Sequence, residues 1–202
     1  MNKKAFIFVC FFLTFFVGFA SAKTLGLNLL VGGVYTNHQL HSSSGTDHDG
    51  FSTWVIKSKH MGGFNAGLFY DLPKNWSVYL NTQFSFNKIF VNDTQAGFGY
   101  NFKPGKVFNL FLGGAFAFGG SKHGNSNSSY EYGHIGGGVS FIPSFMISNK
   151  IGLYMGVMGS IYKPVSGYHV TTSKNGTNRN ALSHLPTMTT SINVMIGVRV
   201  KF

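Results

Sequence analysis

The clearest pattern of apolar and polar positions covers residues 187–202. Apolar or weakly polar side chains occupy every second position, and mostly polar ones lie between them. Since successive side chains of a strand point to opposite faces, the pattern predicts one strand with an apolar face and a mostly polar face. The apolar face carries Met188, Thr190, Ile192, Val194, Ile196, Val198, Val200 and Phe202. Strands of soluble proteins are typically about five or six residues long, so this one is unusually long.

Seven further segments alternate in the same way, and turn-forming residues separate them. The expected strands cover roughly residues 25–35, 57–72, 76–87, 96–103, 108–118, 135–141 and 151–161. The expected connections are short at 73–75, 104–106 and 143–150, of medium length near 92–93, and long at 38–50, 119–129 and 163–186. An even strand number with alternating short and long connections is typical of outer-membrane barrels. We therefore expect an all-β fold: a closed, eight-stranded, antiparallel up-and-down transmembrane β-barrel with both chain ends on the short-turn side.

A soluble eight-stranded barrel such as a lipocalin is the alternative, because it has the same period with the faces reversed. A water-facing surface is usually about a quarter or more Lys, Arg, Glu and Asp, whereas the polar face here is mostly Asn, Ser, Thr, Gln and Gly. The apolar face carries aromatic residues near strand ends, where a membrane-interface girdle lies. These are Tyr70, Trp76, Tyr100 and Phe202. The pattern favours a membrane barrel, whose closure satisfies every backbone polar group in lipid.

Residues 1–22 have the pattern of a cleavable secretory signal. Lys3 and Lys4 precede an apolar run over 5–20, and small residues at 20–22 form a cleavage site. A membrane anchor is the alternative, but the run is shorter than the roughly 20 residues that a spanning helix needs. We expect removal of 1–22 and one barrel domain at 23–202, located in the outer membrane of a Gram-negative-type envelope.

The end of the last strand resembles the C-terminal signal of bacterial outer-membrane barrels. The resemblance rests on Gly197, Val200 and Phe202, and the chain departs from the pattern at Met195, where the family has a polar residue. In that family the barrel-assembly machinery reads the signal. The resemblance therefore implies this machinery as a partner.

Deletion of Phe202 should leave export intact but impair insertion into the membrane, because it removes the aromatic residue that ends the assembly signal. The measurement is the amount of heat-modifiable, folded protein in isolated outer membranes. Wild-type amounts of folded protein from the deletion variant would contradict the prediction.

The chain is strongly basic, with 16 Lys and Arg against 5 Asp and Glu and a net charge of +11. Without Lys3 and Lys4, 14 basic residues remain against 5 acidic ones, a net charge of +9. Such a charge attracts acidic glycans and anionic lipid. Nucleic acid is not an expected partner, because the basic residues are scattered along an exported chain. The basic residues expected in extracellular loops, facing lipopolysaccharide-type glycolipid or host glycans, are Lys57, Lys59, Lys122, Lys163, Lys174 and Arg179.

Glycine occupies many inward positions of the expected strands, together with bulkier residues such as Leu30, Phe69 and Phe111. Small barrels of the OmpA and OmpX type are solid, with lumens filled by ionic and polar networks, and this chain has few interior charges for an extensive network. A glycine-lined, partly apolar lumen is more similar to the OmpW group, whose members are associated with passage of small hydrophobic molecules. The resemblance implies a narrow conduit for small apolar solutes. If the barrel conducts, we expect its constriction at the inward bulky residues Leu30, Phe69 and Phe111, because the neighbouring inward glycines cannot narrow a passage.

The alternative is a closed lumen. Eight strands enclose little besides side chains, so glycine would then only make room for inward aromatic residues. The barrel would be a non-conducting structural or adhesive surface protein that displays its basic loops. The sequence leaves both functions open.

Asp71 and Arg199 face inward near the periplasmic ends of their strands. Burial of a lone carboxylate is costly. We therefore expect an ion pair between these two residues, with Lys103 or Lys201 as substitute partners.

Neither a cofactor, a metal site nor a catalytic site is expected. A Gly- and Ser-rich loop gives metal ligands little fixed geometry. The possible ligands in this loop are His38, His41, Asp47, His48 and Asp49. Some small outer-membrane barrels modify lipid A, and these need a His with a Ser or acidic partner at the membrane rim. No such set assembles from the spacing of His134, His169, His184, Asp93 and Glu131.

Overall fold

The computed structural model describes residues 26–41, 59–87, 89–105, 107–124, 127–173, 176–183 and 185–202. The expected signal segment, 1–22, lies outside the described residues. The same holds for six residues considered above as ligands, loop cations or catalytic candidates. They are Asp47, His48, Asp49, Lys57, Lys174 and His184.

The described chain consists almost entirely of strands. They are β1 (Leu27–His41), β2 (Lys59–Asp71), β3 (Trp76–Phe86), β4 (Ile89–Phe102), β5 (Phe108–Gly124), β6 (Ser128–Met146), β7 (Ile151–Ser173), β8 (Gly176–Ala181) and β9 (Met188–Lys201). One short 3-10 turn, η2 (Pro73–Asn75), joins β2 to β3. No helix in the described part of the chain is long and apolar enough to cross a membrane.

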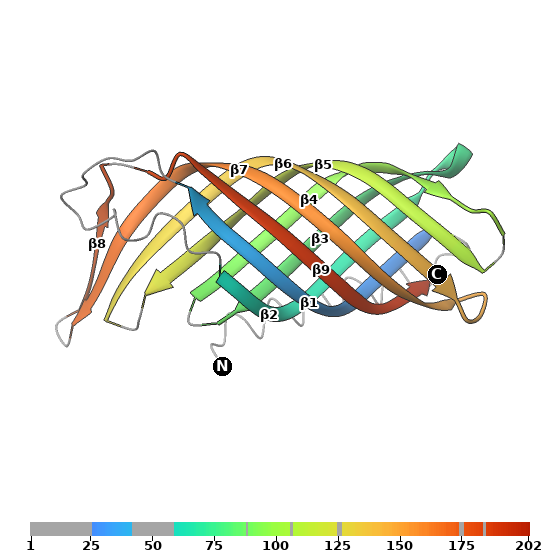
Figure 1. Cartoon of the computed structure of the whole chain (residues 1–202), viewed down its shortest axis with the longest axis horizontal. Coiled ribbons are helices and arrows are strands. Elements are labelled where there is room, and N and C mark those ends of the chain that lie inside the picture. The colour runs from blue at the N-terminus through green and yellow to red at the C-terminus, as the bar shows by residue number, and fades with distance from the viewer. Residues whose placement is uncertain are drawn as a thin grey trace.

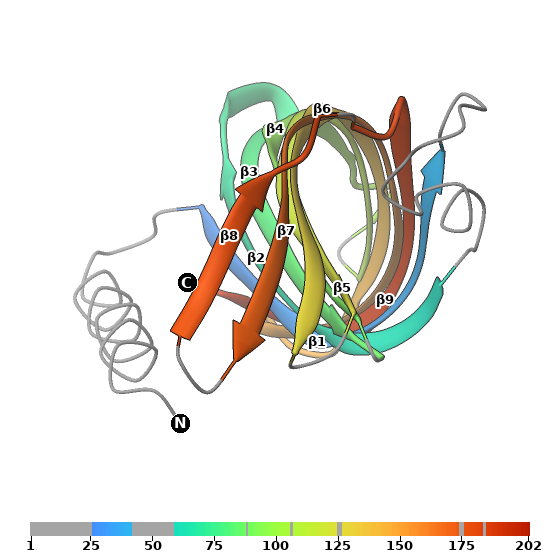
Figure 2. The same cartoon turned by 90° about the vertical axis from the view of Figure 1, so that its left-hand side faces the viewer.

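Eight of the strands form a closed antiparallel barrel, which confirms the predicted fold class. Each strand from β1 to β7 pairs with the next, β7 pairs with β9, and β9 pairs with β1. Figure 1 shows the tilted strands along the barrel, and Figure 2 shows the closed ring from one end. The additional strand β8 pairs only with the outer part of β7, from Tyr168 to Ser173, and projects beyond the barrel wall.

The predicted alternation separates the outside of the barrel from its inside. On β9, Ile192, Val194 and Ile196 are 53%, 49% and 65% exposed, whereas Asn193 and Met195 between them are 0% and 1% exposed. Every second residue of this strand therefore contacts the surroundings of the barrel. Because these outward residues are aliphatic and carry no charge, the surroundings are the hydrocarbon core of a membrane.

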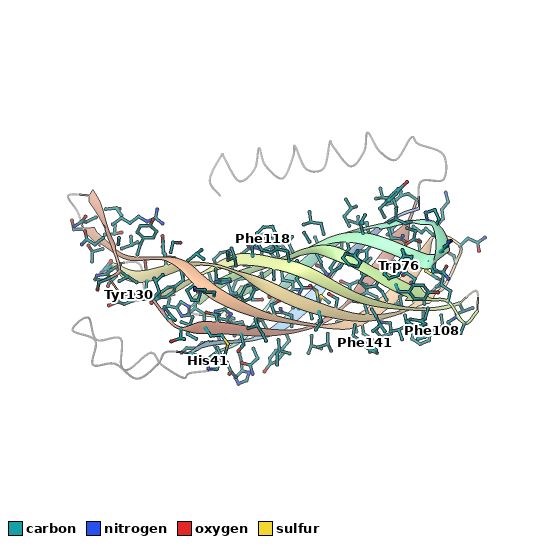
Figure 3. All side chains as sticks on the ribbon, turned by 90° about the horizontal axis from the view of Figure 1, so that it is seen from above. His41, Trp76, Phe108, Phe118, Tyr130 and Phe141 are labelled. Atoms are coloured by element: carbon teal, nitrogen blue, oxygen red, sulfur yellow. The ribbon has the colours of Figure 1, made fainter. Side chains whose placement is uncertain are left out.

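Aromatic side chains gather on the outside near the short-turn end. Trp76 lies 5.5 Å from Tyr100, ring centre to ring centre, and Tyr100 lies 4.8 Å from Phe102. Figure 3 shows Trp76 and Phe108 toward this end, with His41 and Tyr130 toward the opposite end. Short turns are periplasmic in outer-membrane barrels. The end that carries η2 and the C-terminus is therefore the periplasmic end.

Two facing glycines allow β1 and β9 to close the barrel. Gly32 and Gly197 are partners across the two strands. A Cβ atom on Gly32 would lie 2.7 Å from the Cα of Gly197 and closer still to the carbonyl oxygen of Ile196. Glycine is therefore required here because the neighbouring backbone occupies the place of a side chain.

Several strands extend further than predicted. Residues expected in loops lie within strands: His38 and His41 in β1, Asn92 and Asp93 in β4, and residues 163–173 in β7. Likewise 119–124 belong to β5, 128–129 and 143–146 to β6, and 176–181 to β8. The prediction ended each strand where apolar alternation ended. Backbone pairing continues past that point because its hydrogen bonds do not depend on the side chains.

The register between β6 and β7 shifts by one residue at Gly133 and His134. The extra residue on β7 is a bulge, which bends a strand locally. The pairing of β7 with β9 ends at Tyr162, and its pairing with β8 begins at Tyr168. The bulge therefore lies where β7 stops pairing with β9. Beyond this point β5, β6, β7 and β8 form a sheet that projects from the end of the barrel.

Candidate functional site

The inward side chains fill the lumen in four layers. The inward residues of β1 show the order of these layers, from the periplasmic end outward. Asn28, Leu30, Val34, Thr36 and His38 are all no more than 6% exposed. Asn28 belongs to a polar layer, and Leu30 and Val34 belong to an apolar layer. Thr36 belongs to a hydrogen-bond network, and His38 belongs to a group of histidines. Each layer contains residues from several strands.

The polar layer at the periplasmic end contains Arg199, which is 7% exposed. Its Nε donates to Asn28 Oδ1 at 3.0 Å, and its Nη1 donates to Ser144 Oγ at 3.0 Å. Asp71 forms its ion pair with Lys103, at 3.5 Å, and accepts a hydrogen bond from Ser77. The ion pair expected between Asp71 and Arg199 was therefore wrong. Asp71 pairs with Lys103, one of the expected substitute partners, instead.

The apolar layer brings together the three residues expected at a constriction. Leu30, Phe69 and Phe111 are 2%, 4% and 2% exposed and belong to one buried cluster. The Phe69 and Phe111 rings meet edge to face with centres 5.1 Å apart, and both contact Tyr79. Other strands add Ile142, Tyr154, Met158 and Met195 to the same cluster. The side chains pack as a core, and a role of the three residues in restricting solute passage stays a prediction.

A buried carboxylate lies at the centre of the next layer. Asp93, 1% exposed, accepts hydrogen bonds from the Tyr162 hydroxyl, from Ser160 at 3.5 Å and from Asn193 at 2.8 Å. Thr36 in turn donates to Asn193 at 2.6 Å. The donors to Asp93 come from β7 and β9, and Thr36 of β1 is connected to them through Asn193, so the network around one β4 residue links widely separated strands.

The same layer continues through neutral amides and hydroxyls. Gln95 accepts from Tyr79 and Ser140, and its amide donates to Ser160 at 2.8 Å. Tyr154 donates to Asn65 at 2.7 Å. The expectation that few interior charges would leave the lumen without an extensive network was wrong in this respect, because Asn, Gln, Ser and Tyr build one around a single carboxylate. Sequence analysis missed it since Asp93 was assigned to a loop.

Three histidines from three strands meet above this network. His38 lies 6.1 Å from His123 and 5.9 Å from His134, ring centre to ring centre. His134 also lies 4.3 Å from the ring of Tyr162, below it. Both ring nitrogens of His38 and of His134 lack a hydrogen-bond partner among the described residues. Within the same residues, no group of three His, Cys, Asp or Glu side chains is arranged to hold a metal ion.

The candidates for lipid A chemistry are separated by the barrel wall. His134 and Asp93 point into the lumen and are 2% and 1% exposed. Glu131 lies on the outside, where its carboxylate pairs with Lys122 at 3.2 Å and with Arg179 at 3.4 Å. His169 stacks on Tyr130, with ring centres 4.7 Å apart. These four residues therefore form no common site.

An outer patch lies on the projecting sheet near the extracellular rim. We define it by Lys122, Glu131, Tyr168 and Arg179, from β5, β6, β7 and β8. The guanidinium of Arg179 lies 3.9 Å above the Tyr168 ring, and these residues line a hollow of about 390 Å³. Lys163 is also exposed, on β7, while Lys59 begins β2. The described basic residues expected in loops therefore lie on strands.

Comparison with known proteins identifies the fold and no close relative. The sequence matches no protein-family profile and no curated protein. Among solved structures, the chain is similar to Neisserial surface protein A, with a TM-score of 0.59 and 15% identity over 88% of this chain and 97% of that one. It is also similar to Ail, the attachment invasion locus protein of Yersinia pestis, with a TM-score of 0.51 and 11% identity over 89% of this chain and 100% of that one.

The similar structures are small outer-membrane barrels, and the present chain shares their closed eight-stranded architecture. In the present chain the strand β8 is added to this eight-stranded ring. Its aliphatic and aromatic exterior independently requires a membrane. The chain is a small eight-stranded β-barrel protein of the bacterial outer membrane.

Proposed function

We propose that this protein is a non-conducting outer-membrane barrel that displays its projecting sheet for contact with anionic glycans. The observation that carries the proposal is the filled lumen. Apolar packing of Phe69, Tyr79 and Phe111 spans one layer, and hydrogen bonds around Asp93 span the next. Opening a path would break both layers, which does not favour the conduit for small apolar solutes.

The outer patch supports the second half of the proposal. Lys122 and Arg179 side chains are 50% and 56% exposed although both contact Glu131, and together the three leave one net positive charge. Arg179 and Tyr168 form a cation–aromatic pair beside the hollow. A sugar ring could pack on the aromatic face of Tyr168, and its anionic groups could contact the guanidinium of Arg179 and the ammonium group of Lys122 on the same surface. Phosphorylated lipopolysaccharide-type glycolipid and sulfated host glycan share this chemistry.

One comparison adds to this support. A solved complex of Ail holds sucrose octasulfate, a heparin analogue, and the present chain resembles that structure with a TM-score of 0.50 and 12% identity over 89% of this chain. That binding belongs to Ail. Here it identifies heparin-type glycans as a suitable probe.

The wild-type protein should be electrically silent in planar bilayers and should not admit small apolar solutes into liposomes, because the two packed layers block the lumen. An open porin reconstituted in the same way is the positive control. Steady single-channel current, or solute uptake above that of protein-free liposomes, would contradict the proposal and restore the conduit.

Glycan binding tests the displayed surface. Lys122→Gln together with Arg179→Gln should weaken binding of the micelle-bound protein to heparin-type and lipopolysaccharide-type glycans by about tenfold, at roughly 0.7 kcal/mol for each exposed charge. Lys74→Gln with Lys150→Gln removes two charges at the opposite end and is the matched control. Equal losses in both variants would contradict a specific role of the outer patch. Comparing the two glycans identifies the source of the ligand.

A further inference from the structure

The periplasmic end of the barrel contains a cavity of about 400 Å³. Its walls come from β1, β2, β5, β6 and β9 and from the short connections beside them. The polar and charged lining includes Asn28, Asp71, Lys103, Asn109, Arg199 and Lys201. We call this cavity the periplasmic vestibule, because its lining residues lie at the end that carries the short turns and the C-terminus.

Arg199 is the buried cation of the vestibule. It is only 7% exposed, and its two hydrogen bonds go to neutral acceptors, Asn28 Oδ1 and Ser144 Oγ, each at 3.0 Å. No carboxylate of the described residues lies within 4.0 Å of its guanidinium. A guanidinium carries five N–H donors, so these two bonds leave others that can face the cavity. Burial of a cation is costly without an anionic partner.

The other charges of the vestibule form no direct ion pair with Arg199, although Asp71 attracts it from beyond 4.0 Å. Asp71, the one carboxylate in the lining, is 3.5 Å from Lys103 and also accepts from Ser77. Lys201 is exposed and has no ion pair within the described part of the chain. Three basic groups and one acidic group therefore give the lining a net charge of +2. A net positive charge of this kind favours the approach of an anion to the vestibule.

We propose that the periplasmic vestibule binds a small oxyanion, the phosphate or carboxylate group of a periplasmic solute. Arg199 is the buried ligand, because a planar guanidinium matches the paired oxygens of both groups. Lys201 adds attraction at the opening, and Lys103 stays with Asp71. The volume lies within the range of small-molecule sites, so the vestibule accommodates an organic anion as well as inorganic phosphate.

The test is a titration of the full-length mature protein in zwitterionic micelles at low ionic strength. One arm uses inorganic phosphate and the other uses succinate, and the readouts are calorimetric heat and the NMR resonance of the Arg199 Nε–H group. We expect saturable binding in at least one arm, accompanied by a shift of that resonance. Saturation by phosphate alone identifies a phosphoryl ligand, and saturation by succinate alone identifies a carboxylate ligand.

Three substitutions make the test specific. Arg199→Gln should weaken binding at least about tenfold, because it removes a charge-assisted, paired contact. Lys201→Gln should weaken it about threefold, since this side chain is exposed and its charge is screened. Lys150→Gln, a charge change in a periplasmic turn outside the lining, should have no effect.

The proposal is overturned if neither anion binds saturably to the wild type, or if binding leaves the Arg199 resonance unchanged. It is also overturned if Lys150→Gln weakens binding as much as Lys201→Gln, because the attraction would then be diffuse. Should Arg199→Gln fail to fold, the resonance shift and the two exposed Lys variants still decide the outcome. None of these results depends on conduction or glycan binding at the other end.

Discussion

Replacement of Gly32 by valine should prevent the barrel from closing and leave little or no folded protein in the membrane. Gly32 lies opposite Gly197 at the pairing of β1 with β9, which joins the first and last strands. A Cβ on Gly32 would be 2.7 Å from the Cα of Gly197 and nearer still to Ile196 O. Both atoms belong to backbone, so relief of the clash requires the two strands to separate and lose their hydrogen bonds, which lipid cannot replace.

The neighbouring glycine provides the control. Gly33 points outward, and the nearest atom to a Cβ placed there is Gly63 O at 4.0 Å. Gly33→Val should therefore fold at wild-type levels, since β-branched residues suit strands and the added methyl groups face lipid. The measurement for both variants is heat-dependent gel mobility of outer-membrane protein. Folded Gly32→Val in wild-type amounts would contradict the close backbone contact of these strands.

Tyr162→Phe should reduce the free energy of unfolding by about 2 kcal/mol, because it removes a hydroxyl that donates to the buried Asp93 carboxyl. The donors to Asp93 that remain include Ser160 at 3.5 Å and Asn193 at 2.8 Å. A buried acceptor that loses a strong donor and cannot reach water bears the cost of its desolvation. Urea unfolding from phospholipid vesicles measures the difference.

Tyr35→Phe is the matched substitution on the outside. Tyr35 is 51% exposed, and its hydroxyl contacts His60 Nδ1 at 2.6 Å. Removal of this hydroxyl should cost about 0.5 kcal/mol or less, as is usual for exposed positions. Equal losses for the two variants, or no loss for Tyr162→Phe, would show that the hydrogen bonds around Asp93 do not stabilise the barrel.

The sequence predicted the barrel because alternate residues of each strand face two different environments, lipid and the lumen, and differ in polarity accordingly. Ile196 and Met195 show why this works: Ile196 faces lipid and is 65% exposed, whereas its neighbour Met195 faces the lumen and is 1% exposed, as the alternation indicates. The eight strands, their order and the orientation of the chain follow from this local pattern. Strand ends were less predictable, since pairing outside the lipid continues without apolar residues, as in β7 and β8.

The lumen depended on contacts that no local pattern contains. Asp93 follows Asn92 in the sequence, and this pair of residues suggested a turn. Its hydrogen-bond donors Tyr162 and Asn193, however, are 69 and 100 residues away along the chain. Asp71 and Arg199 were placed correctly at the periplasmic end, but Lys103 from the end of β4 reached the carboxylate. The sequence by itself therefore determined which face of each strand meets lipid, because that depends on one side chain at a time. Only the tertiary structure decided which inward groups meet, because closing the ring sets the height of each residue relative to those on the other seven strands.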